Sequence, residues 1–149
     1  MTLPEIKNLF LQTLAPLYPK TEIDSFFHLL LEHHFKTEKI DLALDPELTR
    51  KEWPEIIFLE ALDQLLEERP IQYVMGHAEF AGLKFKVNEK VLIPRPETEE
   101  LVEWMVDTID KSLPLKVLDI GTGSGCIPVT LSLNLPRAEV HALDVSEDA

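Results

Sequence analysis

The chain has 149 residues, with 14 Lys and Arg against 27 Asp and Glu, so its formal net charge is −13. A surface this acidic repels phosphate backbones, and we therefore expect no direct binding to nucleic acid. No apolar run approaches the roughly 20 residues that a membrane span requires, and the N-terminus has no features of a signal or transit peptide. The single cysteine, Cys126, cannot form an intrachain disulfide. This suits a reducing compartment, and we expect a cytoplasmic protein.

The first half of the chain carries apolar residues at helical spacing. One helix is expected over residues 3–17. A second is expected to begin at Thr21, placed to be its N-cap with Asp24 three residues later. A third begins near Trp53, where the following proline suits a first helical turn. The apolar face predicted for this third helix consists of Ile56, Ile57, Ala61, Leu62, Leu65 and Leu66.

The spacing changes to a period of two after residue 76. Leu83, Phe85 and Val87 alternate with Lys84 and Lys86, which is typical of a half-buried strand. The segment 78–80 is its expected hairpin partner. A helix is then predicted from about 97 to 109, with one apolar face made of Leu101, Val102, Met105, Val106 and Ile109.

The last segment has the pattern strand, glycine loop, helix, strand. We predict strands over 116–120 and 138–143, with a helix over 126–135 between them. A βαβ unit of this kind starts a parallel sheet, which helices must cover. The predicted fold class is therefore α/β. Its three parts are a small helical bundle over 1–75, a hairpin linker over 76–92 and the first part of a doubly wound domain over 93–149.

The loop between the two strands carries the strongest chemical signal. Asp119 precedes it, Asp144 follows the second strand, and its residues are Gly121, Thr122, Gly123, Ser124 and Gly125. Glycines allow a sharp turn and close approach of a ligand to the main chain. A carboxylate at the end of the next strand can accept hydrogen bonds from both hydroxyls of a ribose.

Two cofactors compete for such a loop. Dinucleotide sites usually have the spacing Gly-x-Gly-x-x-Gly, whereas the third glycine here comes one position earlier, at Gly125. A carboxylate just before the loop also disfavours a pyrophosphate. S-adenosylmethionine carries a sulfonium cation and an α-amino group but no phosphate, so it suits Asp119 better.

A second stretch narrows the interpretation. Residues 92–103 read Leu-Ile-Pro-Arg-Pro-Glu-Thr-Glu-Glu-Leu-Val-Glu, and the segments 70–73 and 76–83 lie upstream. Together with residues 117–127, they are similar in order and spacing to the HemK family, the peptide chain release factor N5-glutamine methyltransferases. The resemblance runs from about Arg69 to the end of the sequence. Its most specific part is the Arg-Pro-Glu-Thr-Glu run.

The resemblance implies a class I, Rossmann-like methyltransferase that uses S-adenosylmethionine. Its substrate would be the side-chain amide nitrogen of the glutamine in the Gly-Gly-Gln motif of peptide chain release factors. By motif, Gly121 to Gly125 would hold the methionine moiety and Asp144 the ribose. The helical bundle would recognise the substrate. The residues expected to line the site are Arg95, Pro96, Glu97 and Thr98.

The family's Asn-Pro-Pro-Tyr motif, which receives the glutamine, does not occur in these 149 residues. An amide nitrogen is a poor nucleophile because its lone pair is delocalised into the carbonyl. Catalysis therefore depends on acceptors that hold the amide N–H groups and aim the nitrogen at the methyl carbon. We expect the chain to be a truncated N-terminal portion with no catalytic residue of its own. Alone it should be inactive and should tend to self-associate through its open sheet edge.

Two alternatives stay open. The enzyme could methylate another amide or an exocyclic amine in protein or nucleic acid, or residues 1–75 could act alone as a protein-docking module. No metal site is expected, since the adjacent His33 and His34 lack further ligands. Trp53, Trp104 and Cys126 are expected to be packing residues.

Overall fold

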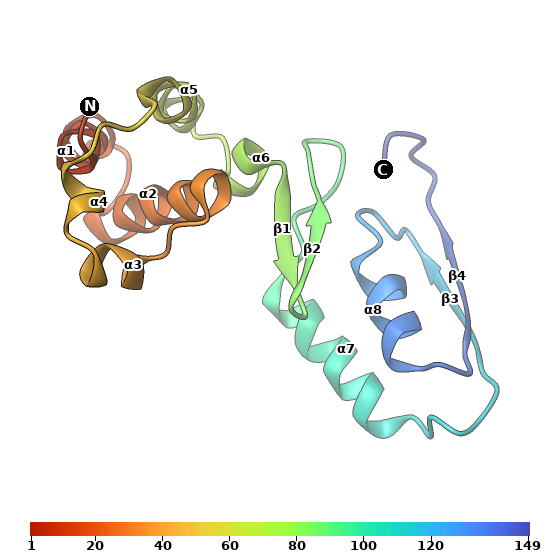
Figure 1. Cartoon of the computed structure of the whole chain (residues 1–149). Coiled ribbons are helices and arrows are strands. Elements are labelled where there is room, and N and C mark those ends of the chain that lie inside the picture. Colours follow the sequence, from red (N-terminus) through yellow and green to blue (C-terminus); the bar gives the residue numbers. More distant parts are fainter. The chain divides into compact units, whose positions relative to one another are not determined.

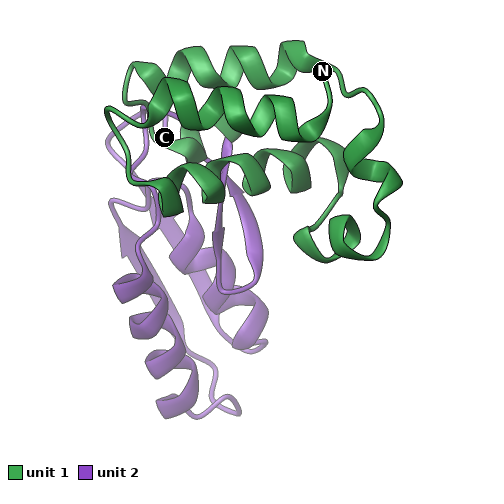
Figure 2. Cartoon of the chain, turned by 90° about the vertical axis from the view of Figure 1, so that its left-hand side faces the viewer, with its two compact units in different colours: residues 1–75 green, residues 76–149 purple.

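The computed structural model describes residues 1–149, and the chain divides into two compact units, Met1–Met75 and Gly76–Ala149 (Figures 1 and 2). The first unit is helical, with α1 (Leu3–Leu14), α2 (Lys20–Phe35), α3 (Lys39–Leu44), α4 (Glu47–Arg50), α5 (Glu55–Leu66) and α6 (Ile71–Met75). The second unit consists of β1 (His77–Phe80), β2 (Leu83–Lys86), α7 (Pro96–Thr108), β3 (Lys116–Ile120), α8 (Cys126–Asn134) and β4 (Glu139–Leu143). None of the helices is long and apolar enough to cross a membrane.

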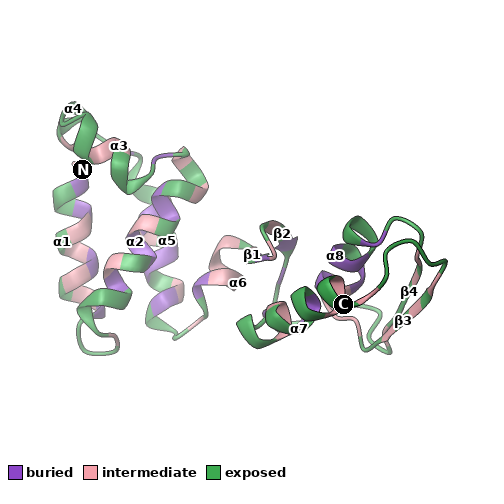
Figure 3. Ribbon diagram, turned by 90° about the horizontal axis from the view of Figure 1, so that it is seen from below, coloured by how far each residue is buried: buried purple, intermediate pink, exposed green.

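Three phenylalanine rings hold the first unit together. Phe27 of α2 and Phe58 of α5 stack with ring centroids 5.9 Å apart, and Phe10 of α1 meets their edges at 6.1 and 6.3 Å. Aromatic pairs in these geometries stabilise a core beyond the effect of buried area alone. The three long helices predicted from apolar spacing are thus present and share one core, drawn as buried inward faces in Figure 3.

The N-terminus of α2 differs from the prediction. Pro19 occupies the N-cap position, and its carbonyl accepts the N–H groups of Glu22 and Ile23 at 3.0 and 3.2 Å. Thr21 therefore already lies inside the helix, and the cap predicted there is wrong. Asp24 pairs with Lys7 of α1 at 2.9 Å instead of capping its own helix.

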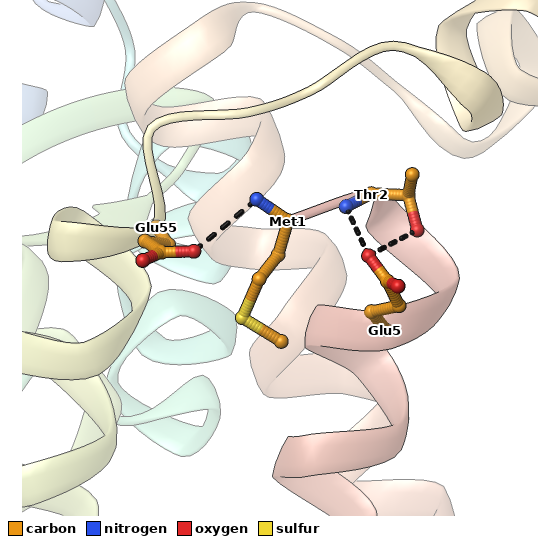
Figure 4. A network of polar contacts seen from close by, with 4 residues as sticks. All are labelled: Met1, Thr2, Glu5 and Glu55. Carbon is orange, nitrogen blue, oxygen red and sulfur yellow. Dashed lines mark hydrogen bonds and ion pairs between the residues drawn. The ribbon is translucent and has the colours of Figure 1, made fainter.

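A side-chain cap does form at the N-terminus of α1 (Figure 4). The backbone N–H and the hydroxyl of Thr2 donate to Glu5 Oε2 at 2.8 and 2.9 Å. These hydrogen bonds lower the pKa of Glu5 below its ordinary value. The Met1 ammonium lies 3.2 Å from the carboxylate of Glu55, which joins the N-terminus of the chain to the first residue of α5.

The buried face of α5 also differs from the prediction. Phe58, Ala61, Leu62 and Leu65 form the buried stripe at positions i, i+3, i+4 and i+7. Ile56 is 58% exposed and Leu66 is 42% exposed, so their placement on the core face is wrong. The stripe is rotated toward Phe58 because this ring meets α1 and α2. Trp53 packs as predicted, and its indole N–H donates to the Leu48 carbonyl.

The second unit has a core of its own. The predicted hairpin forms as an antiparallel β1–β2 pair, and Phe80 and Phe85 from it enter the core. The other buried members are Val102 of α7 and Cys126, Leu131 and Leu135 of the α8 segment. The hairpin is thus part of this unit. Trp104 is 64% exposed, so the prediction that it packs is wrong. It lies two residues from Val102, on the opposite side of a helix that buries one face.

The strands β3 and β4 pair in parallel, which confirms the predicted βαβ unit. The helix α8 packs against both strands on one face. On the other face the register places Leu118 beside His141 and Ile120 beside Leu143, and all four side chains are exposed. One face of this two-stranded sheet is therefore uncovered.

Candidate functional site

The glycine loop lies between β3 and α8. Its three glycines have positive φ angles of 79° at Gly121, 53° at Gly123 and 76° at Gly125, which other residues adopt only with strain. A Cβ added at Gly121 or Gly123 would meet nothing within 4 Å. The loop conformation therefore depends on glycine, and the space beside its main chain is open to a ligand.

Internal hydrogen bonds fix the loop to the end of β4. The N–H groups of Gly121 and Thr122 both donate to the Leu143 carbonyl, at 2.8 and 3.2 Å, and the Gly125 N–H donates to the Thr122 carbonyl at 3.0 Å. The Gly123 N–H donates to the Asp144 carboxylate. Only Ser124, of the five loop residues, has a main-chain N–H without a partner inside the protein.

Asp144 lies at the end of β4, where the sequence predicted a ribose-binding carboxylate. Its Oδ2 accepts the Gly123 N–H at 2.8 Å, and its Oδ1 accepts the Ser146 N–H at 2.9 Å. The hydrogen bonds from Ser146 and Gly123 hold the pKa of Asp144 below its ordinary value. The link to the loop was not predicted. An ionised carboxylate has about four acceptor positions, so Asp144 retains capacity for further donors.

Two polar atoms beside the loop are buried and have no partner in the protein. They are Oδ2 of Asp119, at the end of β3, and the hydroxyl oxygen of Thr122. Buried polar atoms in native proteins are nearly always hydrogen-bonded. A carboxylate oxygen and a hydroxyl left in this state fit a ligand that carries hydrogen-bond donors or positive charge.

A cavity of about 440 Å³ opens beside the loop. Gly123, Ser124 and Gly125 form part of its wall. The wall is completed by residues from the hairpin and the following segment and from the end of the chain: Gly76, Lys86, Val87, Asn88, Val91, Asp148 and Ala149. Lys86 could not be predicted as a lining residue from the sequence, because in a period-two pattern it is indistinguishable from any other solvent-facing lysine.

The run from Arg95 to Thr98 forms the start of α7. Arg95 is the N-cap residue, and its carbonyl accepts the N–H groups of Thr98 and Glu99 at 3.0 and 3.2 Å. None of Arg95, Pro96, Glu97 and Thr98 lines the cavity beside the glycine loop. Glu99, the next residue of this run, accepts the Ala81 N–H at 2.9 Å and so ties α7 to the hairpin turn.

A strand, a glycine loop, a helix and a carboxylate after the next strand make up an arrangement with which α/β proteins bind nucleoside-containing cofactors. Sequence comparison gives the particular family. The chain is 46% identical over its whole length to a protein of Flavobacterium psychrophilum and 42% identical to one of Streptococcus pneumoniae. It is 41% identical over 93% of its length to a protein of Bacteroides thetaiotaomicron.

All three relatives are named release factor glutamine methyltransferase. The chain spans about half the length of these curated relatives, namely 53%, 52% and 49%. No family model matches it. The chain matches the N-terminal portion of the release factor glutamine methyltransferases, and the resemblance to the HemK family is confirmed.

Proposed function

We propose that this chain supplies the cofactor-binding part and the helical unit of a class I, Rossmann-like methyltransferase. The reaction moves a methyl group from S-adenosylmethionine to the side-chain amide nitrogen of the glutamine in the Gly-Gly-Gln motif of peptide chain release factors. The names of the relatives support this substrate. The geometry of the glycine loop supports the cofactor.

The observation that carries the proposal is the internal bonding of the loop amides. Phosphate-binding loops present free main-chain N–H groups to the anion. Here the N–H groups of Gly121, Thr122, Gly123 and Gly125 are all used within the protein. The loop also lies between two carboxylates, Asp119 and Asp144. This favours a cationic cofactor without phosphate over a dinucleotide.

We propose that the residues of the site bind different parts of the cofactor. The Asp144 carboxylate accepts the ribose hydroxyls. The Asp119 carboxylate and the Thr122 hydroxyl, both with a buried oxygen that has no partner in the protein, accept hydrogen bonds from the α-ammonium group of the cofactor. The loop from Gly121 to Gly125 holds the methionine moiety. The run from Arg95 to Thr98 does not line the cavity beside this loop, and on the family resemblance alone it is proposed to line another part of the site. When bound, S-adenosylmethionine would supply an electrophilic methyl group, activated by the positively charged sulfonium sulfur to which it is attached.

The acceptor side of the reaction is not contained in these residues. Holding and aiming a glutamine amide requires acceptors for its N–H groups, and the Asn-Pro-Pro-Tyr motif that would provide them is absent from the 149 residues. The helical unit, residues 1–75, is proposed to recognise the release factor. The net charge of −13 agrees with a protein substrate better than with nucleic acid.

Cofactor binding can be measured on the chain itself by calorimetry with S-adenosylmethionine and, as a rival, with NAD. The substrate is tested with a chimera in which these residues replace the matching segment of the Flavobacterium psychrophilum relative. The chimera should transfer labelled methyl to a release factor, and a release factor with Gln→Ala in its Gly-Gly-Gln motif should accept none. Tighter binding of NAD than of S-adenosylmethionine would contradict the proposed cofactor. Methyl labelling of the Gln→Ala release factor would contradict the proposal that this glutamine is the methyl acceptor.

A further inference from the structure

The cavity beside the glycine loop is lined by a lysine that forms no ion pair or hydrogen bond within the protein. Three lysines lie in or just after the hairpin. Lys84 pairs with Glu79 at 3.7 Å and Lys90 pairs with Asp148 at 3.4 Å. Lys86, which lines the cavity, has no carboxylate within 4 Å and no hydrogen-bond partner. The lining of this cavity thus carries one unpaired positive charge, on Lys86, together with the loop residues Gly123, Ser124 and Gly125.

A second donor lines the same cavity. The side-chain oxygen of Asn88 accepts the Lys90 N–H at 2.8 Å. This hydrogen bond fixes the orientation of the amide, so its NH₂ group, which has no partner, is the part available to a ligand. The Ser124 N–H adds a third donor without an internal partner. An ammonium group, an amide NH₂ and a main-chain N–H together suit an anion of carboxylate size.

Charges of both signs lie near the loop, and Asp148, which also lines the cavity, is paired with Lys90. Lys86 and Asn88 line the cavity from the hairpin side, whereas Asp119 and Asp144 lie at the ends of the two strands. The amino-acid end of S-adenosylmethionine is itself a zwitterion with an α-carboxylate and an α-ammonium group. Building on the proposed function, we infer that Lys86, assisted by the Asn88 amide, binds the α-carboxylate of the cofactor and so orients its methionine end.

Lys84 provides a matched control. It lies two residues before Lys86 on the same exposed face of β2, but it pairs with Glu79 and does not line the cavity. Lys86→Ala and Lys84→Ala remove the same charge from the same strand. Any general effect of net charge or strand stability should therefore appear in both variants, whereas loss of a carboxylate contact should appear only in Lys86→Ala.

The probes are S-adenosylmethionine and decarboxylated S-adenosylmethionine, which lacks only the α-carboxylate, titrated into the 149-residue chain by calorimetry. Lys86→Ala should weaken binding of S-adenosylmethionine by about tenfold, as expected for a hydrogen bond to a charged group. It should leave binding of the decarboxylated compound unchanged. Lys84→Ala should change neither, and Lys86→Arg should retain most of the affinity. The tenfold difference should shrink as salt is raised, because the pair is solvent-exposed.

Three other outcomes of these titrations would contradict the inference, the proposed cofactor or both. Equal weakening of both compounds in Lys86→Ala would show that Lys86 acts through the fold and would overturn the inference. Unchanged affinity for S-adenosylmethionine in that variant would do the same, while leaving the proposed function intact. If the unmodified chain binds neither compound, with a circular dichroism spectrum that shows it folded, the proposed cofactor fails and the inference fails with it.

Discussion

The Asp144 carboxylate accepts a hydrogen bond from the Gly123 N–H at 2.8 Å. This contact joins the end of β4 to the middle of the glycine loop, 21 residues earlier in the chain. The residue proposed to bind the ribose therefore also holds the loop proposed to bind the methionine moiety. Formation of the loop and placement of the ribose acceptor are coupled through a single side chain.

We expect Asp144→Ala to weaken binding of S-adenosylmethionine by about 1–3 kcal/mol, the usual effect of leaving polar groups unpaired. Calorimetry on the chain and on the variant measures this difference. The exposed Glu147→Ala, three residues later, is the control and should bind as the unmodified chain does. Unchanged affinity in Asp144→Ala would remove this residue from the site.

The first unit, residues 1–75, should fold without the second because its core cluster is entirely its own. A polypeptide of these residues should show a cooperative thermal transition by circular dichroism. A gradual loss of helix with no transition would show that residues 76–149 are needed.

Phe58→Ala should lower the free energy of unfolding of this first unit by about 3–5 kcal/mol, because it removes a ring that stacks on Phe27 in a filled core. Ile56→Ala, two residues earlier on the same helix, should change it by no more than about 0.5 kcal/mol, since Ile56 is exposed. Urea denaturation measures both. Similar effects of the two substitutions would contradict the placement of α5.

Glu99→Ala should loosen the hairpin turn. Glu99 accepts the Ala81 N–H, and Ala81 has a φ of 49°, which a residue with a side chain adopts only under constraint. Loss of this partly exposed hydrogen bond should cost about 1 kcal/mol and should speed hydrogen exchange at the Ala81 amide. The neighbouring Glu100→Ala should leave that exchange rate unchanged. Equal rates in the two variants would show that the contact does not hold the turn.

The β3–β4 sheet should be the least protected part of the chain in hydrogen exchange. A two-stranded sheet is marginal in water by itself, and α8 packs on one face only. On the other face Leu118, Ile120 and Leu143 are 58%, 72% and 52% exposed. Amides over 117–143 should exchange faster than those of α5. Equal protection in a sample shown to be monomeric by ultracentrifugation would contradict this expectation, whereas protection that rises with concentration would indicate association through the sheet.

The stability of the first unit should fall as the solution is acidified from pH 7.5 to pH 5.5. Burial, with smaller effects of Lys7 and Lys39, lowers the pKa of His28 in the folded state. The unfolded chain, with a histidine pKa of about 6.5, then binds more protons than the folded one. The contribution of His28 to stability is therefore present above that pH and is lost as the pH falls through the folded pKa. His28→Gln should reduce the dependence of Tm on pH over this range, and an undiminished dependence would exclude His28 as its source.

Local sequence patterns predicted the β-hairpin and the βαβ unit of this protein. Alternation of Leu83, Phe85 and Val87 with lysines predicted the hairpin, because a strand has a period of two whatever it packs against. The β-prone runs on either side of the glycine loop predicted the βαβ unit for a similar reason. Glycine at three positions with positive φ is a requirement of the loop backbone itself, so the candidate cofactor loop could be found without a structure.

Only the tertiary structure decided which side of each element is used. Ile56 and Phe58 are equally apolar, and Phe58 is buried because its ring meets Phe10 and Phe27 from two other helices. Lys84 and Lys86 occupy equivalent positions in the pattern, yet one pairs with Glu79 and the other faces the cavity. The sequence predicts the period of a helix or strand, whereas its neighbours, distant along the chain, determine which face is covered. The contact of Asp144 with Gly123 also depends on the tertiary structure, because the two residues meet only when β4 pairs with β3.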